Sequence, residues 1–222
     1  MRQAAEPFDD AGALASNHEP FARLLERNGR PPDLRRPATF ETLVRLILEQ
    51  QVSLQSASAA FGRLERRVGK VTPGAVVSLS DEQLRADGFS RQKARYVKGV
   101  AQLLIEGALD LKAVASLDAD DAVARLTAIR GVGPWTASCF ALFVNGAADV
   151  WPRGDRALHV SMTRVMGLDD VPSSNAAASI AAAWSPHRST AARMLWHEYL
   201  GGASWRPPDT AGFIEGAGMV PS

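Results

Sequence analysis

A glycine-rich turn is the part of the sequence whose residue types are best suited to chemistry. Gly131, Val132 and Gly133 separate two apolar helical patterns, and Pro134 is favoured in the first turn of a helix. These residues predict a helix, a short hairpin and a second helix that runs to about Asn145. The free amides and positive dipole end of such a helix can bind a phosphate without a basic side chain. An ordinary helical hairpin without a ligand is the common alternative.

Asp155 ends the Gly- and Pro-containing segment that follows this second helix. The next helical pattern begins directly after it, so Asp155 is also a natural N-cap. The combination of hairpin, Gly/Pro segment and aspartate is nevertheless more specific than the hairpin alone. It makes Asp155 a candidate for chemistry beside a bound phosphate.

The elements around these residues are predicted to be helical throughout. Helical spacing and capping residues indicate about ten short helices, and no segment shows the alternation of a strand, so the predicted fold class is all-α. The best-marked helices follow Thr39, run from Ser53 to Val68, start with a Ser80–Gln83 capping box, and run from Arg91 to Glu106. We expect residues 1–17 to be poorly ordered and Thr72-Pro73-Gly74 to interrupt the chain.

Four segments resemble the helix-hairpin-helix, Gly/Pro…Asp (HhH-GPD) superfamily of DNA base-excision glycosylases. They are LVRLILEQQVSLQSA, GFSRQKARYVKGVA, GVGPWTASCFAL and SPHRSTAARMLWHEYL. Within the superfamily they look most like the monofunctional alkylpurine (3-methyladenine) glycosylases of the AlkA type, over roughly residues 40–200. The resemblance implies a two-lobed helical fold with a cleft between the lobes and without the extra N-terminal β domain of the bacterial form. Residues 38–146 would form the hairpin lobe and residues 147–222 the other, on which residues 1–37 would pack.

The resemblance also implies roles for the motif residues. Asp155 matches the family's catalytic carboxylate, which stabilises the positive charge that develops on the sugar when the N-glycosidic bond breaks. The DNA backbone would be bound at the hairpin and at the start of the next helix, by Gly131, Val132, Gly133, Trp135 and Thr136.

The base pocket of the family falls on Trp135, Cys139 and His187. Bifunctional relatives have a Schiff-base lysine at the position of Trp135, so its indole implies that lyase chemistry is absent. An indole also attracts a cationic alkylated base, although core packing is the simpler role. Cys139 and His187 replace family aromatics. Cys139 favours plain apolar packing, and a surface or capping role is equally open for His187.

Gln51 falls where the family inserts a side chain into the gap left by the flipped nucleotide. The alternative is a polar residue at a helix end that faces water. Nearby, four basic residues share one helical segment and form either a solvated face or a flank for DNA. They are Arg91, Lys93, Arg95 and Lys98.

The only cofactor that the resemblance implies is a monovalent cation. The carbonyls of Thr127, Ile129 and Gly131 match the family's site for a monovalent cation, Na⁺ or K⁺, in the hairpin. A single cysteine excludes the four-cysteine iron–sulfur cluster of some relatives and any disulfide within the chain. No other cofactor is expected.

The predicted function is therefore a monofunctional glycosylase that flips and excises alkylated purines by hydrolysis. Its partner would be double-stranded DNA with damaged bases, not a membrane, and we expect a monomer in the cytoplasm, associated with the nucleoid. The net charge of +1 gives weak support for DNA binding. A glycosylase for uracil, deaminated or oxidised bases and a non-catalytic DNA-binding module stay open. A carboxylate beside phosphates favours an enzyme over a binding module.

Overall fold

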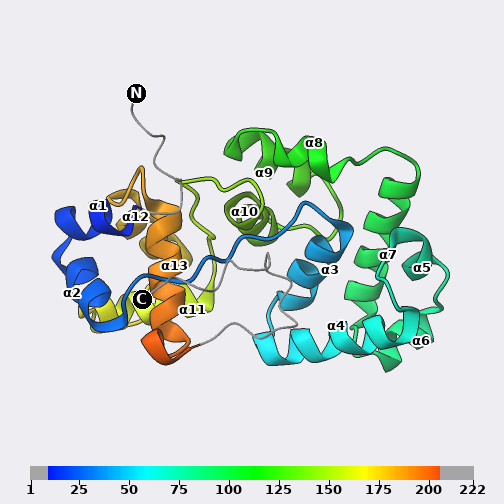
Figure 1. The fold of residues 1–222 in the computed structure, drawn as a ribbon, viewed down its shortest axis with the longest axis horizontal. Coiled ribbons are helices and arrows are strands. Elements are labelled where there is room, and N and C mark those ends of the chain that lie inside the picture. The colour runs from blue at the N-terminus through cyan, green and yellow to red at the C-terminus, as the bar shows by residue number, and fades with distance from the viewer. Residues whose placement is uncertain (1–9, 206–222) are drawn as a thin grey trace.

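The computed structural model describes residues 10–205, and these residues form only helices, turns and connecting segments (Figure 1). The all-α prediction is thus confirmed. The α-helices are α1 (Ala11–Asn17), α2 (Glu19–Asn28), α3 (Phe40–Glu49), α4 (Leu54–Val68), α5 (Pro73–Val77), α6 (Asp81–Ala86), α7 (Arg91–Ile105), α8 (Leu111–Ala115), α9 (Ala119–Thr127), α10 (Pro134–Phe143), α11 (Arg156–Met166), α12 (Ser174–Ala182) and α13 (Arg188–Tyr199), and a 3-10 turn follows at Gly202–Ser204.

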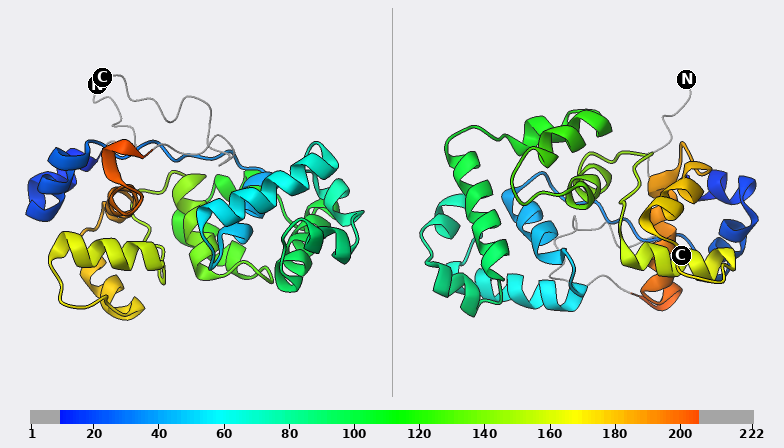
Figure 2. Two further views of the ribbon diagram at one scale, coloured as in Figure 1. Left: turned by 90° about the horizontal axis from the view of Figure 1, so that it is seen from below. Right: turned by 180° about the vertical axis from the view of Figure 1, so that it is seen from behind.

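The helices pack in two groups that lie next to each other (Figures 1 and 2). One group holds α3 to α10, with α10 against α9 and α3, and α7 against α3, α5 and α6. The other is built on α13, which contacts α1, α2, α11 and α12. The chain begins in the second group with α1 and α2, and the segment between α2 and α3 carries it to the first group. The predicted lobe boundaries remain a prediction.

Two helices form the centre of the first group because they are apolar around most of their circumference. In α10 every residue from Thr136 to Phe143 is buried, and in α3 all but two residues are buried. A helix that is hydrophobic on all sides belongs inside a protein core. The hairpin and the end of α3 are thus attached to the most deeply buried helices of this group.

Most predicted helix starts carry the expected cap. The side chains of Thr39, Ser53 and Ser80 accept hydrogen bonds from the third residue beyond, and Ser80 and Gln83 form a complete capping box. Three short helices were missed: residues 11–17 form α1, Pro73 begins α5, and α8 has no counterpart in the predicted list. Each is held by packing on a longer helix, which a local pattern does not show.

In residues 10–205, no helix has both the length and the apolar character that a membrane span requires.

Candidate active site in the interlobe cleft

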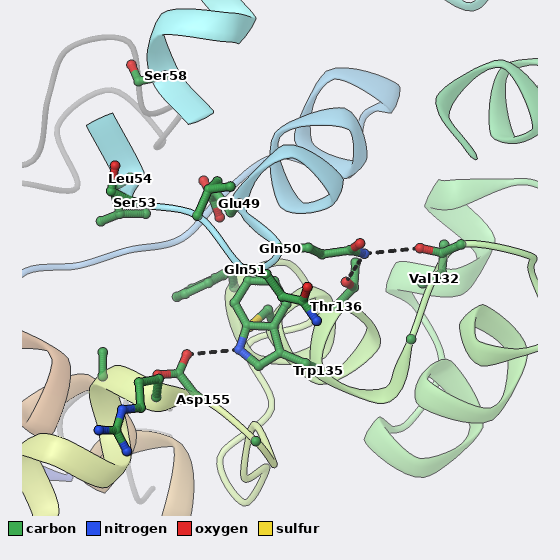
Figure 3. Close-up of a pocket in the computed structure, with 18 of the residues that line it drawn as sticks. Glu49, Gln50, Gln51, Ser53, Leu54, Ser58, Val132, Trp135, Thr136 and Asp155 are labelled. Carbon is green, nitrogen blue, oxygen red and sulfur yellow. Dashed lines mark hydrogen bonds between the residues drawn. The ribbon is translucent and has the colours of Figure 1, made fainter. Parts of the chain in front are cut away.

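A cleft of about 2180 Å³ opens between the two groups of helices (Figure 3). Its walls come from the end of α3, the start of α4, the hairpin with the start of α10, residues 153–157, and the end of α13. The sequence-predicted residues Gln51, Trp135, Cys139 and Asp155 all line it. The structure therefore brings the hairpin and the aspartate, which come from different groups, to one cavity.

The hairpin owes its shape to Gly131. Its φ is +94°, and a Cβ atom there would come within 2.1 Å of the Tyr96 ring, so only glycine suits the position. The Gln50 amide fixes the turn from the other side, because its Nε2 donates to the Gly131 carbonyl at 3.0 Å and to Thr136 Oγ1 at 2.7 Å. The hairpin is thus held between α7 and the end of α3.

Three amides at the start of α10 have no acceptor among the described residues, as a phosphate site requires. Gly133 is the N-cap of α10 without a side chain, and among the described residues no acceptor is recorded for the amides of Gly133, Trp135 and Thr136. The amide of Val132 is different, since it donates to the Ile129 carbonyl at 3.0 Å inside the turn. The prediction that Val132 binds the DNA backbone through this amide is therefore wrong. The other positions stay predictions.

Asp155 lies at the start of α11 with both carboxylate oxygens engaged. Oδ1 accepts from the Leu158 amide at 2.9 Å as an N-cap, and Oδ2 accepts from the Trp135 indole Nε1 at 2.8 Å (Figure 3). The residue is 9% exposed and lines the cleft. Trp135 thus does more than pack: it fixes the orientation of the carboxylate across the cleft.

The segment before Asp155 is braced on the start of α13. Arg188 Nε donates to Asp149 at 2.7 Å, and Ser185 Oγ donates to the same carboxylate at 2.7 Å. Ser189 Oγ accepts from the Val150 amide at 3.0 Å. Burial acts to raise the pKa of Asp149, but the hydrogen bonds from Arg188 and Ser185 and the charge of Arg188 hold it below its usual value. The bonds of Asp149 and Val150 thus attach the segment that leads to Asp155 to the start of α13.

Part of the cleft lining is apolar. Cys139 is fully buried, and burial raises the pKa of its thiol well above the ordinary value, so it behaves as a small apolar residue. Phe143 and Trp196 also line the cleft, and their ring centroids are 5.5 Å apart. Neither aromatic was predicted from the sequence, since they come from α10 and α13 and meet only through packing. They supply aromatic surface near the position where Cys139 has none.

His187 does not line the cleft, so its prediction as a pocket residue is corrected. Its Nδ1 lies 3.1 Å from the Asp10 carboxylate at the start of α1. The reason is its place directly before α13, at the end that packs on α1, whereas the cleft is lined by Trp196 and Tyr199 near the other end of the helix.

Gln51 occupies the turn between α3 and α4 with a φ of +56°, a conformation that is uncommon for a residue with a side chain. It is exposed at the rim of the cleft, next to the exposed apolar side chains of Val52 and Leu54. Unfavourable backbone conformations often mark functional sites. The gap-filling role of Gln51 remains a prediction that this position favours.

Two of the four basic residues of α7 have structural partners. Lys93 Nζ donates to the carbonyls of Leu48 and Gln50, at 2.6 and 2.8 Å, and so caps the end of α3. Lys98 pairs with Asp81 at 2.7 Å. Lys93 therefore attaches the start of the Gln50–Gln51 turn to α7.

The predicted cation carbonyls are partly engaged. The Ile129 carbonyl accepts from Val132 and the Gly131 carbonyl accepts from Gln50. Each carbonyl has a second lone pair, so binding of Na⁺ or K⁺ by Thr127, Ile129 and Gly131 remains a prediction.

Comparisons with known proteins agree with this geometry. The sequence profile of the HhH-GPD superfamily of base excision DNA repair proteins matches residues 44–186. The putative DNA-3-methyladenine glycosylase YfjP of Bacillus subtilis is 26% identical over 184 residues, which are 79% of this chain and 64% of that protein. The chain thus spans somewhat less than two thirds of this relative.

Two solved structures are also similar. The 3-methyladenine DNA glycosylase of Schizosaccharomyces pombe in complex with abasic DNA aligns with a TM-score of 0.78 at 26% identity, over 84% of this chain and 94% of that one. A DNA-3-methyladenine glycosidase from Bacillus halodurans aligns with a TM-score of 0.69 at 30% identity, over 90% and 93% of the two chains.

Proposed function

Because the chain belongs to the HhH-GPD superfamily of base excision DNA repair proteins, we propose that it is a monofunctional DNA glycosylase for alkylated purines of the 3-methyladenine type. One observation carries the proposal: the Asp155 carboxylate lines the cleft opposite the hairpin and is oriented by the indole of Trp135. The relatives named for 3-methyladenine support the substrate class.

The proposed reaction is hydrolysis of the N-glycosidic bond of a nucleotide flipped into the cleft. As the bond from C1′ to the base breaks, its electron pair leaves with the base and positive charge develops on the sugar. Asp155 stabilises that charge, water supplies the hydroxyl group to C1′, and the remaining proton goes to solvent or the base. Alkylation at N3 or N7 makes the base cationic and a better leaving group. No amine is needed for this sequence of steps.

Duplex DNA with one alkylated purine tests the proposal. The protein is expected to release the base and leave an abasic strand that stays intact until alkali is added. Borohydride should trap no covalent adduct, because the position of the family's Schiff-base lysine holds Trp135. A bifunctional glycosylase run in parallel provides the positive control for trapping. Efficient trapping of this protein would show that another lysine forms the Schiff base and would exclude the monofunctional mechanism.

The phosphate role of the hairpin is tested by Gly133→Asp. The φ of Gly133 is −80° and a Cβ atom there would meet nothing within 4 Å, so the variant should fold, with aspartate as a suitable N-cap. Its negative charge at the phosphate site should weaken duplex binding by on the order of tenfold or more, equally at all sequences. Fluorescence anisotropy at fixed salt measures this.

Gly133→Asn is the matched control, since it adds the same bulk without the charge. Its binding loss should be clearly smaller than that of Gly133→Asp. Equal affinities of the wild type and Gly133→Asp for duplex DNA would show that the N-terminus of α10 does not bind a DNA phosphate.

A further inference from the structure

An ion pair lines the cleft next to the apolar side chain of Phe143. Arg36 Nη2 and Nη1 lie 2.9 and 3.3 Å from the two carboxylate oxygens of Glu49, the last residue of α3. The side chain of Arg36 is 3% exposed and that of Glu49 is 12% exposed. Both belong to the lining of the cleft, and Figure 3 shows Glu49 beside Gln50 and Gln51. The carboxylate is therefore the part of the pair nearer to the open space.

Folding alone explains this pair poorly. Burying two charges costs about as much as their attraction returns, and apolar residues of similar size often do as well. Glu49 is also at the C-terminal end of α3, where the helix dipole disfavours a negative charge. Arg36, in turn, is fixed by its backbone, whose amide donates to the Phe143 carbonyl at 2.9 Å, and its guanidinium lies 5.2 Å from the Phe143 ring centroid. A buried charged pair in the lining of a cleft is the kind of fixed polar group that orients a ligand in a binding pocket.

Glu49, Asp155 and Cys139 all line this cleft. The charges of Asp155 and Glu49 add to burial in raising the pKa of the Cys139 thiol, while that of Arg36 opposes them. Two carboxylates and one guanidinium therefore line the same cavity as Cys139. A flipped nucleotide with its sugar at Asp155 would place its base in this cavity, which the ion pair also lines.

The part of a purine that points away from the sugar is its six-membered ring with the substituent at C6. In adenine this is an amino group, which donates hydrogen bonds, and in guanine it is an oxygen, which accepts them. A carboxylate only accepts. It therefore favours the amino group and opposes the oxygen.

We propose that Glu49 is a specificity-determining residue whose carboxylate, oriented by Arg36, accepts a hydrogen bond from the 6-amino group of a flipped alkylated adenine. This inference rests on the proposed function and adds to it a preference for alkylated adenine over alkylated guanine. A site that hydrogen-bonds one substrate group rejects an analogue that lacks it, because its own polar group is then left unpaired.

Glu49→Gln tests the proposal on methylated duplex DNA that contains both 3-methyladenine and 7-methylguanine. Arg36 can only donate, so the glutamine oxygen should turn toward it and present the amide NH₂ to the base. The ratio of initial release rates, 3-methyladenine to 7-methylguanine, is expected to fall about tenfold or more once enzyme-free loss is subtracted. A loss of folded protein lowers both rates together and leaves the ratio unchanged.

Glu41→Gln is the matched control. Glu41 is also on α3 and pairs with Arg45 at 3.0 Å, but neither residue lines the cleft, so this variant should keep the wild-type ratio. An unchanged ratio in folded Glu49→Gln would overturn the assignment of Glu49 and leave the glycosylase function intact. Release of neither base by the wild type would instead contradict the proposed function.

Inhibition of the wild type by free bases tests the assignment even if Glu49→Gln does not fold. Free 3-methylhypoxanthine, which has an oxygen at C6, should inhibit at least about tenfold more weakly than 3-methyladenine. Equal inhibition by the two bases would overturn the proposal.

Discussion

Asp155→Asn is expected to reduce base release on the order of a hundredfold or more while keeping affinity for abasic-site DNA. Asparagine is as good an N-cap as aspartate, so α11 should keep its bond to the Leu158 amide. What is lost is the negative charge beside the sugar. The bond to Trp135 is lost as well, because the asparagine NH₂ then faces the indole N–H. Single-turnover release rates and the melting temperature separate chemistry from folding.

Asp118→Asn provides the matched control. Asp118 is the N-cap of α9 and accepts from the Asp121 amide at 2.9 Å, yet it does not line the cleft. This variant loses the same charge at the same kind of position and should retain wild-type turnover. Near-normal turnover of Asp155→Asn would contradict the catalytic assignment.

Gly131→Ala should lower the free energy of unfolding by about 3 kcal/mol. The φ of +94° strains any residue with a Cβ atom, and the new methyl group would collide with the Tyr96 ring, whose nearest atom is 2.1 Å away. Tyr96 or the hairpin must move, which also disturbs the bond from Gln50 to the Gly131 carbonyl. Urea denaturation of both proteins measures the difference.

Gly133→Ala is the control for this effect, because the two glycines are two positions apart in the same hairpin. Gly133 has an ordinary φ of −80° and open space around its Cα atom. Its substitution should change stability by no more than about 1 kcal/mol. Equal stability of Gly131→Ala and the wild type would show that the turn tolerates a different backbone conformation.

The features predicted well from the sequence are those that depend on neighbouring residues. Thr39, Ser53 and Ser80 cap helices through bonds to amides three positions on, and these patterns are visible in the sequence. The hairpin follows in the same way from glycines and a proline in a fixed order. The positive φ of Gly131 also follows from the residue type, because glycine adopts this conformation without steric cost.

The features that were missed depend on contacts between distant segments. Arg36 and Glu49 pair across 13 positions, and Phe143 meets Trp196 from another helix. No local pattern connects them. Val132 was misassigned because its amide closes the turn, and His187 because the packing of α13 on α1 directs it away from the cleft. In both cases the family motif gave a position and the local hydrogen bonds decided the role.

Release of free base from methylated duplex DNA tests the central claim most directly. The wild-type protein is incubated with DNA methylated on its purines, and the released bases are identified by chromatography and mass spectrometry against an enzyme-free control. We predict 3-methyladenine well above the spontaneous rate, with strands that break only after alkali. Release no faster than in the enzyme-free control, by protein that binds the same DNA, would contradict the proposal that this cleft excises alkylated purines.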